Sequence, residues 1–154
     1  MRKKCRSRGG FTASEMLVAA FILGLIALAF GAGILAAVRV YQKVSAQAEA
    51  GVLCSTLSTA MADELRFAEQ PRQSGEEAKF DSTVYGQGVS LDISGGRVWI
   101  GGVELVSAKT YTGGLKADKC NVTYADQLFH VELEVGDGNS ALVSTGFDVR
   151  ALNG

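Results

Sequence analysis

The chain holds little material for catalysis or for metal binding. Its 154 residues include one histidine, three cysteines and one proline. Three cysteines are too few for the disulfide framework of a small secreted domain, and a single histidine leaves few combinations for a hydrolase or a zinc site. We therefore expect no enzymatic activity and no cofactor.

Positive charge is scarce outside the first ten residues. Those ten include five basic residues and no acid, whereas the rest of the chain holds 10 basic and 16 acidic residues. A surplus of negative charge argues against direct binding of nucleic acid. A hydrophobic fraction of 47% also argues against disorder.

A long apolar run follows the basic start. Residues 16–38 contain no charged side chain and would span about 35 Å as a helix, enough to cross a bilayer. Because the basic residues are concentrated before this run, the positive-inside bias predicts a cytoplasmic N-terminus and a C-terminal part outside the membrane. An ordinary signal peptide, cut near Ala46-Gln47-Ala48, is one alternative, but its apolar stretch is normally only about 7–15 residues long. A plain membrane anchor is another, and it leaves the residues at the boundary unexplained.

The segment before the apolar run, residues 8–16, reads RGGFTASEM. A short basic leader ends in two glycines, Phe11 follows, and Glu15 lies immediately before the run. This arrangement resembles the class III signal of type IV prepilins and pseudopilins, and the resemblance is specific over residues 9–38. It implies that a prepilin peptidase cuts between Gly10 and Phe11, and that the new amine of Phe11 is methylated.

Such a cut would keep the apolar helix in the mature protein as a building element. Glu15 is then costly at the edge of the membrane unless it meets a cation. In the family, the acid at this position is thought to meet the N-terminal amine of a neighbouring subunit. Thr12 and Glu15 also fit a capping box, with Thr12 as the N-cap and Glu15 three residues on, and one molecule can use both roles.

The resemblance implies a single-pass protein of the bacterial cell membrane. Its partners would be the membrane, the prepilin peptidase, other pilin or pseudopilin subunits, an assembly platform protein and an ATPase. Major pilin, minor pilin and pseudopilin all stay open, although Glu15 argues against the tip initiator class, which typically lacks this acid. Two other hypotheses remain: a membrane-anchored extracytoplasmic binding domain that does not polymerise, and a secreted enzyme cut after Ala48.

A helical pattern continues beyond the membrane run. Apolar residues recur at a spacing of four, first at Val40 and Val44 and then at Leu53, Leu57, Met61 and Leu65. This spacing predicts one helix over residues 11–70, which Pro71 ends. The predicted organisation is a leader (1–10), a transmembrane helix (11–38), an amphipathic continuation (39–70) and a β-rich headgroup outside the membrane (71–154).

The headgroup pattern changes to a period of two. Residues 71–79 are polar and predict a loop. Alternating segments at 89–93, 98–100, 103–106, 128–135 and 142–149, with a connection over 113–119, predict an antiparallel sheet of about four to six strands. Asp137-Gly138 is a strong signal for a hairpin turn. The expected fold class is therefore α+β, with a long N-terminal helix on an antiparallel sheet, which agrees with the pilin fold.

Few headgroup side chains suggest chemistry. His130 lies on the polar face of a predicted strand, with Glu132 two residues on. No second ligand follows at a suitable spacing, so we interpret both as solvent-exposed strand residues and not as a metal-binding or catalytic pair. Some pseudopilins bind calcium near their C-terminal loops, and the residues here that could suggest such a site are Glu134, Asp137 and Asn139. The loop lacks the number of ligands that a calcium site requires, and a hairpin turn explains its sequence.

The cysteines leave two alternatives open. Cys5 would leave with the leader. Outside the membrane, Cys54 and Cys120 are either two separate thiols, with Cys54 buried as a small apolar residue, or a disulfide that closes a long loop.

Overall fold

A single α-helix, α1 (Ala13–Arg66), opens the computed structural model, which describes residues 12–152. The chain divides into two compact units, Met1–Lys43 and Val44–Gly154. In the first unit the described part is the N-terminal portion of α1. Its large apolar side chains from Met16 to Val38 are exposed, and the most apolar stretch of α1 has no buried residue. By length and composition this stretch can cross a membrane.

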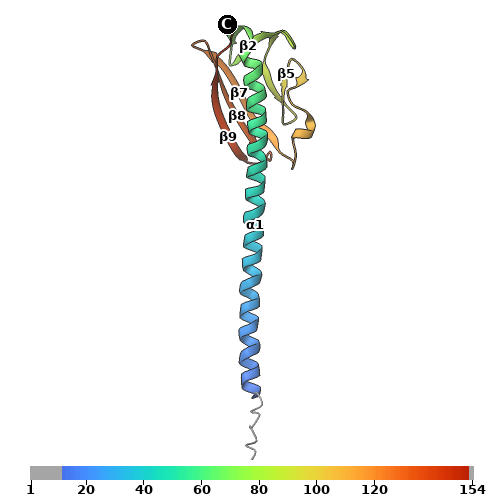
Figure 1. Ribbon diagram of the computed structural model, residues 1–154, viewed down its shortest axis with the longest axis vertical. Coiled ribbons are helices and arrows are strands. Elements are labelled where there is room, and N and C mark those ends of the chain that lie inside the picture. The colour runs from blue at the N-terminus through green and yellow to red at the C-terminus, as the bar shows by residue number, and fades with distance from the viewer. Residues whose placement is uncertain (1–11, 153–154) are drawn as a thin grey trace, which may run out of the picture. The chain divides into compact units, whose positions relative to one another are not determined.

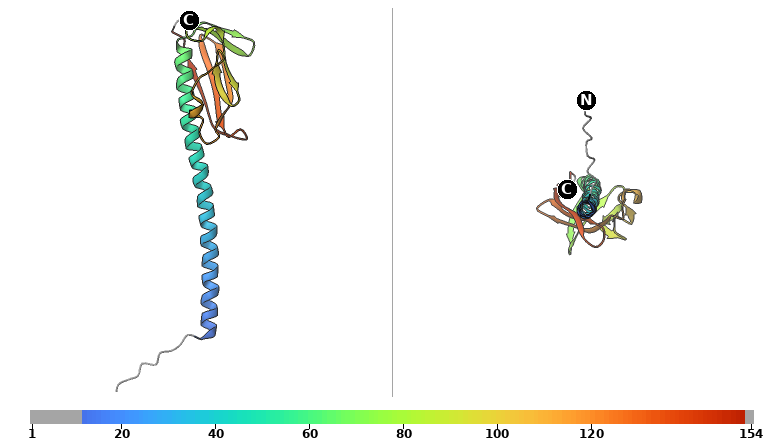
Figure 2. Two further views of the ribbon diagram at one scale, coloured as in Figure 1. Left: turned by 90° about the vertical axis from the view of Figure 1, so that its right-hand side faces the viewer. Right: turned by 90° about the horizontal axis from the view of Figure 1, so that it is seen from below.

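The second unit, called here the C-terminal unit, combines the remainder of α1 with nine strands. In chain order these are β1 (Glu69–Ser74), β2 (Glu77–Ser82), β3 (Gly86–Val89), β4 (Leu91–Ser94), β5 (Arg97–Ile100), β6 (Val103–Glu104), β7 (Lys116–Ala125), β8 (Leu128–Gly136) and β9 (Ala141–Val149). A short 3-10 helix, η1 (Ala108–Thr110), precedes β7. Within this unit the strands lie to one side of α1 (Figure 2).

The strands form three antiparallel sheets of three strands each, in the orders β1-β2-β3, β4-β5-β6 and β7-β8-β9. Strands β7, β8 and β9 lie side by side in Figure 1. The expectation of four to six strands was therefore too low. Part of the difference is that the segment expected over 89–93 is divided at Ser90 between β3 and β4. The expected connection also overlaps β7, where Ala117 is buried and a bulge lies between Ala117 and Lys119.

The expected end of the helix and the loop after it were wrong. α1 ends at Arg66, and residues 69–82 form the hairpin of β1 and β2 around Gly75. Pro71 lies within β1, an outer strand, where a residue without an N–H group is tolerated. The pairing of β1 with β2 is also irregular between Glu69 and Arg72. Pro71 thus interrupts a strand ladder instead of closing a helix.

The predicted helix stripe forms one half of the core. Leu53, Leu57, Met61 and Leu65 are at most 2% exposed. Val40 and Val44, in contrast, are exposed, so the buried stripe begins only at Ala50. From the sheets, the core receives Ala78, Phe80, Val89, Leu91, Val98, Ile100, Leu115, Ala117, Val122, Phe129, Val131, Leu133, Val135 and Val149.

The alternation predicted for β8 is confirmed. Phe129, Val131, Leu133 and Val135 are buried, whereas the residues between them face outward. The ring of Phe129 meets the ring of Phe80 edge-on, with centroids 5.8 Å apart. The expected fold class is confirmed as well, because one long N-terminal helix packs through its C-terminal portion on antiparallel sheets.

Candidate functional site

The start of α1 carries the residues that the sequence marked for assembly. Thr12 is the N-cap of the helix, and its hydroxyl accepts a hydrogen bond from the backbone N–H of Glu15 at 3.3 Å. In return, the backbone N–H of Thr12 donates to Oε2 of Glu15 at 2.8 Å, and the Thr12 hydroxyl donates to the same oxygen at 2.9 Å. The predicted capping box is therefore present.

The capping box fixes the carboxylate of Glu15 at the first turn of an apolar helix. There it lies near the positive end of the helix dipole, which favours an anion. Among residues 12–152, no basic side chain lies within ion-pair distance of this carboxylate. An arriving cation would thus meet an acid that is already oriented. The predicted cleavage site, Gly10 and Phe11, lies outside the described residues.

His130 lies on the outer face of β8, as expected, but it has a partner that the sequence did not reveal. Its Nδ1 lies 2.7 Å from Oδ1 of Asp148, which stands opposite it on β9. Both side chains are substantially exposed, at 41% and 59%. Across the described part of the chain, no group of three histidine, cysteine or acidic side chains is arranged to hold a metal ion.

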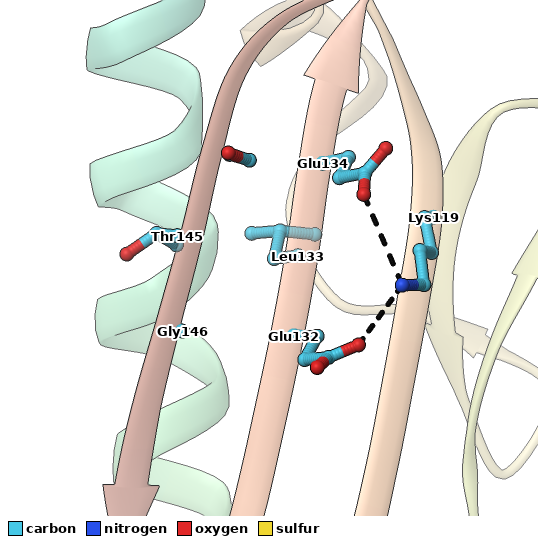
Figure 3. Close-up of a pocket in the computed structure, with 7 residues that line it drawn as sticks. Lys119, Glu132, Leu133, Glu134, Thr145 and Gly146 are labelled. Atoms are coloured by element: carbon cyan, nitrogen blue, oxygen red, sulfur yellow. Dashed lines mark hydrogen bonds and ion pairs between the residues drawn. The ribbon is translucent and has the colours of Figure 1, made fainter.

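The neighbouring hollow on this sheet contains one cationic and two anionic side chains. Its volume is about 290 Å³, and Lys119 lies between two carboxylates in it, with Nζ 2.9 Å from Glu132 and 3.8 Å from Glu134 (Figure 3). The hydrogen bond that Lys119 donates to the carboxylate of Glu132 raises the pKa of Lys119. Exposed ion pairs of this kind contribute little to stability. Lys119 is thus shared between the two carboxylates and lies closer to that of Glu132.

The predicted hairpin turn between β8 and β9 is confirmed. Oδ1 of Asp137 accepts hydrogen bonds from the backbone N–H groups of Asn139 and Ser140, both at 2.8 Å. Gly138 has a φ of +84°, a conformation that favours glycine. These bonds lower the pKa of Asp137.

The two described cysteines are free thiols. Cys54 is buried on the core side of α1, and Cys120 is partly buried on β7 beside Leu133 of β8. Burial raises the pKa of the Cys54 thiol, and it raises the pKa of the Cys120 thiol to about 12. Both side chains therefore belong to the packing of the unit rather than to a reactive site.

Sequence reasoning missed two kinds of feature: side-chain pairs that strand register creates, and large apolar side chains that are exposed. The pairing of Asp148 with His130 follows only from how β9 aligns with β8. Exposure singles out Phe67 and Leu152, which are 61% and 66% exposed despite their size, and no sequence period distinguished them. No protein-family model, curated protein or solved structure matches the chain.

Proposed function

We propose that the chain is a type IV pilin-like structural subunit. A prepilin peptidase cuts it after Gly10, the amine of Phe11 is methylated, and the mature chain assembles into a pilus or pseudopilus through its N-terminal helix. The observation that carries this proposal is the capped start of α1, where Thr12 holds the carboxylate of Glu15 immediately before an apolar stretch with no buried residue.

The apolar stretch supports a role in lipid and then in a bundle of helices. Exposed apolar residues run through it from Met16 to Val38, far more than an isolated soluble helix tolerates. Lipid would cover this surface before assembly, and neighbouring helices would cover it afterwards. Small residues such as Gly24, Gly31 and Gly33 support the second step. A Cβ atom added at any of them would meet nothing within 4 Å apart from the adjoining helix backbone, so the space beside them is open. Small residues allow neighbouring helices to approach closely.

Glu15 gives assembly a register. In an apolar bundle, a carboxylate and an ammonium group stabilise each other, and leaving either alone is costly. Cleavage before Phe11 creates a cationic amine four residues ahead of Glu15, so a neighbouring subunit can provide the missing partner. The membrane, the peptidase, a platform protein and an assembly ATPase complete the proposed set of partners, with the C-terminal unit outside the cell membrane.

Mass spectrometry of the N-terminus of the mature protein tests this function. The chain is expressed in a bacterium that contains a prepilin peptidase, and the membrane fraction is analysed. We expect a first residue of Phe11 with one added methyl group, and a peptidase-deficient strain should retain the leader. An intact Met1 in both strains would favour an anchored binding domain, and a start after Ala48 would favour a secreted protein.

A further inference from the structure

One end of the C-terminal unit contains an apolar hollow beside α1. Its volume is about 260 Å³, and its lining is Ala48, Glu49, Val52 and Leu53 of α1 together with Thr110 and Thr112. Val52 is 68% exposed there although it is apolar. Since a cavity of roughly 150 Å³ can hold a benzene-sized group, the hollow can accept one large apolar side chain.

The other end of the same unit carries two exposed apolar residues, Phe67 and Leu152, which we call the knob. Phe67 follows the last residue of α1, and the backbone N–H of Leu152 donates to the carbonyl of Arg66 at 2.8 Å. The two chain segments therefore lie together. Phe67 and Leu152 are 61% and 66% exposed, so the knob leaves two large side chains in water.

The knob and the hollow of one copy cannot meet. Val52 lies in α1 and Phe67 directly after it, 15 residues further on, which is about 22 Å along the helix axis. A knob can therefore fill only the hollow of another copy. A two-fold axis would make this contact reciprocal only by setting the two helices antiparallel, which copies inserted in one membrane in the same direction do not allow. The contact therefore repeats from copy to copy as a ring or an open helix.

The charges beside the two surfaces are complementary. Arg66 and Arg150 are exposed next to the knob, and Glu49 is the ionisable residue in the lining of the hollow. A second pair has the reverse polarity, because exposed Glu69 lies near the knob and exposed Lys109 lies in η1 beside the hollow, and it too joins opposite charges. Opposite charges around a contact steer association and disfavour other orientations.

We propose that the knob of one copy inserts into the hollow of the next copy, so that C-terminal units join head to tail. The inference rests on the proposed function, because it assigns the contact between headgroups in the same polymer. One aromatic anchor gives a weak contact alone. Repeated along a polymer whose helices already associate, it acts at a high effective concentration.

Cysteine cross-linking between two differently tagged full-length chains tests the contact. One chain carries Val52→Cys and the other Phe67→Cys, and both are co-expressed in membranes and treated with a mild oxidant. We expect a disulfide-linked pair that contains both tags. Each variant alone should stay at the background of the wild-type chain, which controls for Cys5, Cys54 and Cys120. Absence of the mixed pair, or equal cross-linking of one variant with itself, would overturn the head-to-tail contact.

A second measurement uses matched aspartate substitutions at exposed apolar positions. Phe67→Asp should lower the yield of polymer at least tenfold, since it places an uncompensated charge in the hollow. Val84→Asp is the control, because Val84 is 74% exposed and belongs to neither surface. Equal yields from the two variants would also overturn the proposal.

The N-terminal mass spectrum of the same samples separates this inference from the proposed function. A start at Phe11 without the mixed cross-link rejects the head-to-tail contact and leaves the pilin-like function in place. A start at Met1 with the mixed cross-link rejects the pilin-like function, and the contact then describes how an anchored protein associates.

Discussion

The carboxylate of Asp137 stabilises the turn between β8 and β9 through two backbone hydrogen bonds. Because these bonds lower the pKa of Asp137, their contribution is present above the ordinary aspartate pKa of about 3.9 and is lost as the pH falls through the lower folded-state pKa. Asp137→Asn keeps an oxygen acceptor but no charge. In thermal melts of residues 44–154, the wild type should exceed this variant in Tm at pH 6, and the difference should shrink below about pH 4. A difference that is constant with pH would contradict the assignment.

The two cysteines should react slowly while the protein is folded. Alkylating agents attack the thiolate, and burial raises the pKa of Cys120 from 9.0 to about 12, which lowers its thiolate fraction at pH 8 on the order of a thousandfold. Burial also raises the pKa of Cys54. Mass spectrometry after iodoacetamide treatment should find both residues unmodified in the folded unit and modified in urea. Equal labelling rates in the two states would show that the thiols are accessible.

The hydrogen-bond partners of a side chain could be predicted from sequence where those partners are its close neighbours along the chain. The Asp137-Gly138 turn and the Thr12–Glu15 capping box follow from neighbours in the chain, and both are present. The partner of His130 could not be found this way, because Asp148 lies on another strand and only the register of β8 and β9 brings the two together.

At the scale of elements, α1 supplies the buried stripe on which the C-terminal unit depends. Leu57 is fully buried at its centre, so Leu57→Ala should lower the free energy of unfolding by about 3 kcal/mol. Leu57→Asp should unfold the unit, since a buried unpaired charge costs more than a typical domain can lose. Ser55→Asp is the control on the exposed face of the same helix. Circular dichroism melts of residues 44–154 measure all three, and a stable Leu57→Asp variant would contradict this view of the core.

Element type could be read from periodicity, but element boundaries could not. The stripe from Leu53 to Leu65 and the alternation in β8 each repeat several times, so single exceptions do not hide them. β1 gave no such signal because its residues are polar and mostly exposed, and it includes Pro71. Its position depends on distant contacts, among them the bond from the backbone N–H of Tyr124 to Oε1 of Gln73 at 2.6 Å.

At the scale of the whole molecule, each of the two units has its own part in the proposed assembly. The capped apolar stretch exposes its large apolar side chains, and the C-terminal unit is a folded body with its own core. The proposed polymer then has two kinds of contact, one between helices with Glu15 as its charged register and one between knob and hollow. Loss of either contact should weaken assembly without unfolding the subunit.

The two roles of Glu15 can be separated by a matched pair of substitutions. Glu15→Gln keeps the capping box, since a glutamine oxygen can accept from the backbone N–H of Thr12, but it removes the charge. Glu15→Ala removes both. Both variants should be cleaved and inserted like the wild type, and both should assemble at least tenfold less, because neither offers an anion to the amine of the neighbouring Phe11. The measurement is polymer yield after shearing, normalised to processed protein in the membrane. Wild-type yield from Glu15→Gln together with low yield from Glu15→Ala would assign Glu15 to helix capping alone, and the register between subunits would then have to come from other residues.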